Sequence, residues 1–159
     1  MADIPVGPVA GVDCKAYYNS GTHASPTWVE ITKGQNFSVP DFGVNPIAAN
    51  SRESKWEAFT AGLIKSGINF SYLHSRGPDT VRDALAGMVT GRTSKEFAVM
   101  DGDITHVGAR GLRMFGIMEK FTYGQDLEGN QAWDAALKPA YVVESSAKVD
   151  PDLFIVAAA

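Results

Sequence analysis

Two long segments of alternating polarity near the end of the chain constrain its fold more than any other feature. Residues 110–123 place four large apolar side chains on one alternate set of positions, namely Phe115, Ile117, Phe121 and Tyr123. Residues 131–144 alternate in the same way. A period of two predicts β-strands. Because Gly129 and Asn130 between them are turn residues, we expect the two strands to form an antiparallel hairpin.

Shorter segments with the same period extend the β prediction to residues 13–19, 27–31, 36–39, 68–74 and 95–100. A helical period occurs at residues 79–90, where an apolar face is formed by Val81, Leu85, Met88 and Val89. Asp79 is suited to the N-cap of this helix and Gly91 to its C-cap. We therefore expect a mainly β (α+β) fold with one α-helix.

The chain of 159 residues suits one domain with extended ends. Residues 1–12 predict an N-terminal arm because prolines and glycines interrupt them. Residues 13–144 predict the β domain, and residues 145–159 a C-terminal extension with an apolar tip. Residues 40–56 lack periodicity and predict a long loop, and loops of that length are usually functional or disordered.

Composition excludes several classes of function. The chain has 14 basic and 18 acidic residues and a net charge of −4, which argues against a protein that grips nucleic-acid phosphates. The single cysteine, Cys14, excludes an internal disulfide framework and is expected to be a small buried side chain. The N-terminus does not resemble a secretory signal, and no segment approaches the ~20 apolar residues of a membrane helix. We expect a protein made in the cytoplasm, with no membrane partner.

Local motifs for chemistry are lacking. His23, His74 and His106 lie in separate segments without the spacing of metal ligands. The Asp101-Gly102-Asp103 sequence resembles the start of a calcium loop, but the later ligand positions do not fit. No phosphate-binding glycine loop occurs. The sequence therefore predicts no catalytic residue, metal or cofactor, although a site assembled from distant residues would leave no local pattern.

A composite pattern over residues 27–140 is more informative. Its parts are Trp28-Val29-Glu30-Ile31, Trp56-Glu57-Ala58-Phe59, Gly62-Leu63-Ile64-Lys65-Ser66-Gly67-Ile68-Asn69-Phe70-Ser71-Tyr72, Asp83-Ala84-Leu85, Glu96-Phe97-Ala98-Val99, Phe115-Gly116-Ile117-Met118-Glu119-Lys120-Phe121 and Trp133-Asp134-Ala135-Ala136-Leu137-Lys138-Pro139. In order and spacing the pattern resembles the major tail proteins (tail tube proteins) of long-tailed, siphovirus-type bacteriophages.

The resemblance implies a structural virion protein and no enzyme. Members of this family form two packed antiparallel sheets, a sandwich or barrel flanked by one α-helix. Their subunits assemble into hexameric rings that stack into a hollow tail tube, made in the host cytoplasm and used as the conduit for DNA during ejection. The implied partners are other copies of the chain, the tape measure protein and double-stranded DNA in the lumen, and other tail proteins at the tube ends. An acidic balance suits a lumen that repels phosphates, without sequence-specific DNA binding.

The resemblance also implies candidate contacts between subunits or rings. In the expected loop they are the apolar Phe42, Val44 and Ile47 and the charged Arg52, Glu53 and Lys55. In the C-terminal tip they are Leu153, Phe154 and Ile155. Alternatives are a monomeric β-barrel that carries a small ligand, the tube protein of a related gene-transfer or secretion particle, and a small enzyme of no recognised family.

Overall fold

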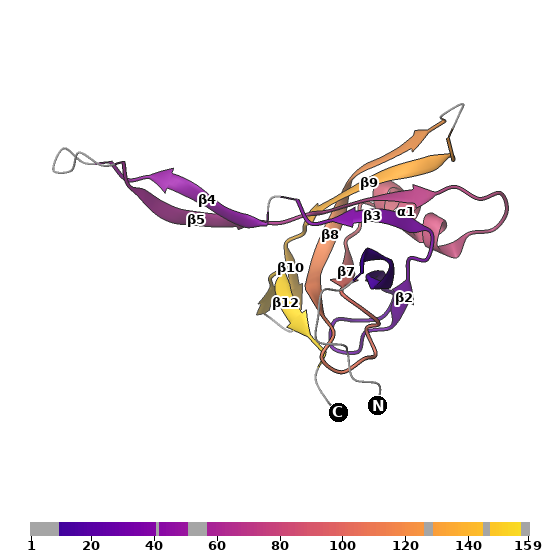
Figure 1. Cartoon of the computed structure of the whole chain (residues 1–159), viewed down its shortest axis with the longest axis horizontal. Helices are drawn as coiled ribbons and strands as arrows, with labels where there is room; N and C mark the ends of the chain where they lie inside the picture. Colours follow the sequence, from indigo (N-terminus) through magenta and orange to yellow (C-terminus); the bar gives the residue numbers. More distant parts are fainter. Residues whose placement is uncertain (1–9, 41, 51–56, 126–128, 145–146, 157–159) are drawn as a thin grey trace.

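The structure is a computed structural model that describes residues 10–40, 42–50, 57–125, 129–144 and 147–156 (Figure 1). Its elements, in chain order, are η1 (Gly11–Asp13), β1 (Lys15–Asn19), β2 (Trp28–Glu30), β3 (Gly34–Ser38), β4 (Gly43–Ala48), β5 (Phe59–Lys65), β6 (Ile68–Leu73), α1 (Thr80–Gly91), β7 (Lys95–Met100), β8 (Arg110–Gly124), β9 (Ala132–Pro139), β10 (Val142–Glu144), β11 (Ala147–Val149) and β12 (Asp152–Ile155). The mainly β class with one α-helix is confirmed.

The body of the protein is built on one eight-stranded antiparallel sheet. Its strand order is β2-β1-β7-β8-β9-β6-β3, and β12 also pairs with β8. Two further pairs, β4 with β5 and β10 with β11, form small sheets of their own. The long strand β8 joins the two halves of the large sheet, because β7 pairs with its first part and β9 with its second.

The large sheet is rolled, so that its two ends meet. Strands β2 and β3 lie at opposite ends of the strand order, yet only residues 31–33 separate them in the sequence. Within this link, the Ile31 amide donates to the Ala16 carbonyl at 2.8 Å, and the Lys33 carbonyl accepts from the Leu73 amide at 2.9 Å. The chain therefore leaves one half of the sheet and enters the other within a single corner. This geometry yields the expected packing of two antiparallel layers.

The apolar core lies inside this roll. It contains Ala16, Tyr18, Ile31, Ile68, Phe70, Tyr72, Leu85, Met88, Phe97, Leu112, Met114, Ala135 and Leu137. Strands β1, β6, β7, β8 and β9 contribute side chains to this core. Helix α1 adds Leu85 and Met88, which are both buried and both belong to its predicted apolar face. A smaller cluster of Tyr17, Ala98, Met100 and Ala109 lies on the other side of β1 and β7.

Helix α1 begins at its predicted cap. The Asp79 carboxylate accepts from the Arg82 amide at 3.1 Å, from the Tyr72 hydroxyl at 2.8 Å and from the Lys33 ammonium at 2.7 Å. The N-cap therefore also fastens the helix to the corner between the two layers. The predicted C-cap was wrong by one position, because Arg92 and not Gly91 adopts the left-handed conformation, with φ of 51°.

The predicted apolar face of residues 110–123 is wrong in its first half. Leu112 and Met114 point into the core, whereas Ile117 is 46% exposed. A β-bulge between Met118 and Lys120 then reverses the alternation, so that Phe121 packs against the core. One extra residue in a strand moves all later side chains to the opposite face.

The second long strand predicted at residues 131–144 is interrupted. Strand β9 ends at Pro139, and β10 starts at Val142 and pairs with β11 instead. Beyond the end of β9, the same edge of β8 pairs with β12, and Leu153 lies opposite Leu112. The segment predicted as a C-terminal extension therefore contributes a strand to the main sheet.

The predicted loop at residues 40–56 is wrong, because β4 lies within it. Strand β4 pairs with β5, so that Gly43 lies opposite Lys65 at one end and Ala48 lies opposite Phe59 at the other. Together these two strands form an arm, which projects away from the body (Figure 1). The sequence concealed the strand because its polarity does not alternate and because Pro46 interrupts it. Residues 51–56 lie outside the described part of the chain.

One smaller expectation also fails. Cys14 is exposed instead of buried, because it precedes the first residue of β1. In the part of the chain that is described, no helix is long and apolar enough to cross a membrane.

Candidate assembly surface

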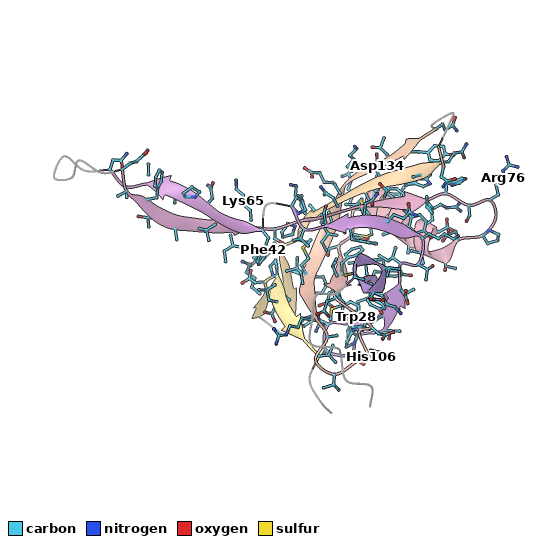
Figure 2. All side chains as sticks on the ribbon, in the orientation of Figure 1. Trp28, Phe42, Lys65, Arg76, His106 and Asp134 are labelled. Carbon is cyan, nitrogen blue, oxygen red and sulfur yellow. The ribbon has the colours of Figure 1, made fainter. Side chains whose placement is uncertain are left out.

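The arm is rooted firmly in the body. Strands β5 and β6 are separated by Ser66 and Gly67, both buried, and the Ser66 hydroxyl donates to the Met114 sulfur at 3.5 Å. Ile68, the next residue, is 1% exposed. The boundary between the exposed arm and the buried body therefore lies between Lys65, which is exposed, and Ser66, which is buried. Figure 2 shows Lys65 and Phe42 at this root.

Beyond the root, the arm contacts little of its own chain. Every residue of β4 is exposed, and β5 is exposed except at Gly62. The hairpin continues past its strands, because the Ala49 amide donates to the Ala58 carbonyl at 2.8 Å. An isolated two-stranded hairpin is marginally stable in water. A hairpin of this kind gains stability when another surface covers it.

The register of the arm assigns its side chains to two faces. Val44 lies opposite Ile64, and Ala48 lies opposite Phe59. Residues directly opposite in an antiparallel pair share a face, and neighbours along a strand alternate. A bulge between Val44 and Pro46 leaves two residues of β5, Gly62 and Leu63, opposite one residue of β4.

One face of the arm is wholly apolar. We name it the apolar face, and it consists of Val44, Pro46, Ala48, Phe59, Ala61 and Ile64. The other, which we name the mixed face, consists of Gly43, Asn45, Ile47, Thr60, Gly62, Leu63 and Lys65. The exposed fractions are 72% for Ile64 on the apolar face and 84% for Leu63 on the mixed face. Large aliphatic side chains therefore stand out on both sides of the ribbon (Figure 2).

The apolar contact residues predicted from the sequence lie at this surface. Phe42 is 49% exposed at the root, and Val44 and Ile47 are 50% and 55% exposed on opposite faces. Their role in subunit contacts stays a prediction. The charged candidates Arg52, Glu53 and Lys55 lie outside the described residues.

The C-terminal candidates are only partly placed. Leu153 is 65% exposed. Phe154 and Ile155 are described by their backbone, which pairs with Gly111 and Arg110 of β8. This segment is therefore bound to its own sheet, and its contact with a neighbour also stays a prediction.

Half of the exposed apolar side chains of the arm were not predicted from the sequence, namely Phe59, Leu63 and Ile64 on β5. These residues are 57%, 84% and 72% exposed. Phe59, Thr60 and Ile64 are aromatic or β-branched, and these residue types favour a strand. Exposure on both faces carries no signal in one sequence, because an apolar run resembles a buried strand.

Polar clusters elsewhere in the fold are structural. Glu96, 2% exposed, accepts from the Arg113 guanidinium, from the Asn19 amide at 2.8 Å and from the His23 ring at 2.7 Å. Burial acts to raise the pKa of Glu96, but these donors outweigh it and lower the pKa. The cluster fastens the connection between β1 and β2 to the outside of the sheet.

The other two histidines do not form a centre with it. His74 stacks edge-on against Tyr123 at 5.3 Å between ring centroids, and His106 is exposed in the turn before β8. Among the residues that the structure describes, no group of His, Cys, Asp and Glu side chains could hold a metal ion.

A polar surface covers the outside of the second half of the sheet. A shallow hollow there is lined by side chains from β3, β6, β8 and β9, including Asn36, Asn69, Ser71, Lys120 and Asp134. The Ser71 hydroxyl donates to the Asp134 carboxylate at 3.0 Å. Asp134 lies on the outer side of β9 (Figure 2). We name these five residues the polar face.

No protein-family model matches the sequence, and no curated protein matches it either. Solved structures do match. The chain from the tail of an empty GTA particle, solved with helical refinement and C6 symmetry, is 17% identical, with a TM-score of 0.66 over 93% of this chain and 98% of that one. GTA denotes a gene transfer agent.

Two other neighbours have the same fold at lower identity. The SPP1 tail tube, solved by solid-state NMR and cryo-EM, is 13% identical, with a TM-score of 0.67 over 95% of this chain and 81% of that one. A chain of the anti-feeding prophage baseplate is 10% identical, with a TM-score of 0.54 over 98% and 99%. The rolled sheet, helix and arm together therefore form a fold that is present in tail particles.

Proposed function

We propose that this chain is a structural subunit of a viral or virus-derived tail tube. Copies assemble into hexameric rings, the rings stack, and the tube conducts DNA during ejection. The fold of the GTA and SPP1 tail chains supports this proposal. The chain has no catalytic role in it.

The observation that carries the proposal is the arm. Six large apolar side chains on it or at its root are each about half exposed or more, namely Phe42, Val44, Ile47, Phe59, Leu63 and Ile64. On the apolar face, Val44, Phe59 and Ile64 are contiguous with Pro46 and two alanines, and monomeric proteins rarely expose a large contiguous apolar surface. Such a surface is typical of a contact with another protein.

The energetics favour many contacts over one. Burying a large apolar side chain contributes ~1.5–3 kcal/mol, so covering the half-exposed side chains of one arm contributes on the order of 5–10 kcal/mol. Association costs ~4–15 kcal/mol in lost freedom of motion. A single arm contact therefore about balances the cost of forming a dimer. A closed ring, in which each subunit gives one arm and receives another, is the favourable outcome.

We place the polar face toward the lumen, where the tape measure protein and then double-stranded DNA would lie. Asn36, Asn69 and Ser71 remain hydrated there, and Lys120 and Asp134 offset each other in charge. With a net charge of −4 for the chain, such a lumen would not retain phosphates. The tube ends would bind other tail proteins.

The alternative of a monomeric ligand carrier is not favoured. Carriers of that kind enclose a cavity inside a β-barrel. Inside this roll, Tyr72, Phe97 and Leu85 are almost fully buried and fill the interior. The tube of a gene-transfer particle is the same assembly in another particle and is included in the proposal.

The test is assembly of the purified chain at high concentration, viewed by negative-stain electron microscopy. We expect rings or tubes with sixfold symmetry. The matched control is a variant in which the turn sequence Asn-Gly replaces residues 41–65. Such a short turn can join the two flanking strands, because Ser38 of β3 pairs with Asn69 of β6 next to the root of the arm. This variant is expected to keep the body's melting temperature and to stay monomeric. A wild-type chain that remains monomeric by light scattering would contradict the proposal.

A further inference from the structure

The outer surface of the second half of the sheet carries few charges. It is formed by β3, β6, β9 and the part of β8 that follows Gly116. These strand segments contain two acidic and two basic residues, namely Glu119, Asp134, Lys120 and Lys138. The excess negative charge of the chain, which has a net charge of −4, therefore lies elsewhere.

Most of the other outward side chains here are small and uncharged. The pairing of the four strands arranges the outward residues in two rows, because residues opposite each other share a face. One row consists of Ser38, Asn69, Ala136 and Lys120, and the other of Gln35, Ser71, Asp134 and Thr122. Amide and hydroxyl groups at an exposed surface form hydrogen bonds with water. The rows therefore present a hydrated surface to whatever passes it.

The four charges of this surface form two pairs of opposite sign. The Lys138 ammonium lies 3.8 Å from the Glu119 carboxylate. Lys120 lies opposite Ala136, and Asp134 is two positions away along β9, so Lys120 and Asp134 are diagonal neighbours, ~7–8 Å apart. The Debye length in physiological salt is ~8 Å. Both pairs therefore cancel over the distance at which salt screens single charges.

We propose that this surface forms an electrically neutral inner wall of the tube, past which double-stranded DNA moves without being attracted or repelled by charge. The proposal rests on the proposed tube function and deepens it for the lumen. It differs from the acidic lumen expected from composition, because composition does not tell on which surface the charges lie. A basic wall would bind phosphates, and an acidic wall would bind cationic polymers.

The experiment shifts the charge of the wall by one unit per subunit in each direction. Asp134→Asn leaves a basic residue uncompensated, and Lys120→Gln leaves an acidic one. Both side chains are exposed, so both variants are expected to keep the melting temperature and the tubes of the wild type. If either forms no tubes, Thr122→Lys or Thr122→Glu makes the same change of charge in the same row as Asp134.

Tubes of the full-length chain are mixed with short duplex DNA or with oligolysine at low salt and viewed in cross-section by cryo-electron microscopy. The wild-type lumen is expected to stay empty with either probe. Asp134→Asn tubes are expected to retain duplex in the lumen, and Lys120→Gln tubes to retain oligolysine there. With one uncompensated charge from each of six subunits, duplex retention should fall on the order of a thousandfold between about 50 and 200 mM salt.

The matched control is Asp83→Asn, which makes the same change of net charge at an exposed carboxylate of α1. Its lumen is expected to stay empty of duplex. The proposal is overturned if wild-type tubes retain either probe in the lumen, if either wall variant stays empty, or if Asp83→Asn retains duplex as Asp134→Asn does. A wild-type chain that forms no tubes would instead overturn the tube function.

Discussion

At the scale of single residues, charge placement is the feature that the sequence concealed. Glu96 occupies an ordinary alternate position of a strand, and its burial depends on donors 17 to 77 residues away in the sequence. No local pattern brings Asn19, His23 and Arg113 to one carboxylate. Asp79 was predictable as a helix cap, because that interaction is local. Its bond to Lys33, 46 positions away, was not.

Asp79 makes the stability of the body depend on pH. Burial acts to raise its pKa, but bonds from Lys33, the Arg82 amide and Tyr72 outweigh burial and lower the pKa to about 2 from an ordinary 3.8. A carboxyl with a lowered folded pKa stabilises the fold above its unfolded pKa, and this contribution is lost as pH falls through the folded value. We expect the free energy of unfolding to fall by about 2 kcal/mol from this group between pH 4 and pH 2.

The check is urea unfolding at several pH values for the wild type and for Asp79→Asn. The variant is expected to be less stable at pH 7 and to show a shallower loss between pH 4 and pH 2. Asp83→Asn, which removes an exposed carboxylate of the same helix, is the control for the change in net charge. An Asp79→Asn curve parallel to the wild type throughout would rule out this role for the cap.

At the scale of elements, alternation predicted those strands that have one buried face. Strand β6, with its regular change between buried and less buried residues, was found with nearly its full bounds. Strands β4 and β5 were not recognised as a pair, because exposure on both faces removes the contrast on which the pattern depends. The bulges in β8 and in the arm were equally hidden, since their positions follow from pairing and not from composition.

Two glycines allow stability and assembly to be separated at this scale. A Cβ at Gly62 would lie 2.5 Å from the Asn45 carbonyl oxygen in the arm, and one at Gly111 would collide with the Val99 carbonyl oxygen in the body. We expect Gly62→Ala to distort the arm and reduce assembly with no change in the melting temperature. Gly111→Ala is expected to lower the melting temperature by forcing β7 and β8 apart.

Circular dichroism melts and electron microscopy of both variants check this contrast. Each variant acts as the control for the other, because the substitution is the same and only its hairpin differs. A melting temperature lowered equally in both would mean that the arm is part of the cooperative body.

At the scale of the whole molecule, the order and spacing of segments predicted the fold better than any single motif did. The resemblance of residues 27–140 to tail tube proteins agrees with the fold that this chain shares with the GTA and SPP1 tail chains. The roll itself could not be derived, because it depends on residues 31–33 crossing between layers. Nor could the projection of the arm, which follows from the burial boundary between Lys65 and Ser66.

The division into a packed body and an uncovered arm predicts two classes of hydrogen exchange. In the body, opening a strand exposes the core around Tyr72 and Leu137, so amides there exchange only through near-global unfolding. In the arm, opening β4 from β5 exposes little that is not already exposed, so these amides are expected to exchange at least a hundredfold faster in the monomer. Assembly covers the arm and should slow them toward the body's rates, while core amides change little.

Exchange measured by mass spectrometry on monomeric and assembled chains tests this expectation. Peptides over residues 43–48 and 59–65 report the arm, and peptides over residues 68–73 and 132–137 report the body. Rapid arm exchange that persists in the assembled state would mean that the arm is not the contact. Slow arm exchange in the monomer would mean that the ribbon is stable without a partner, because its ladder of backbone bonds then suffices where ordinary hairpins in water require cover.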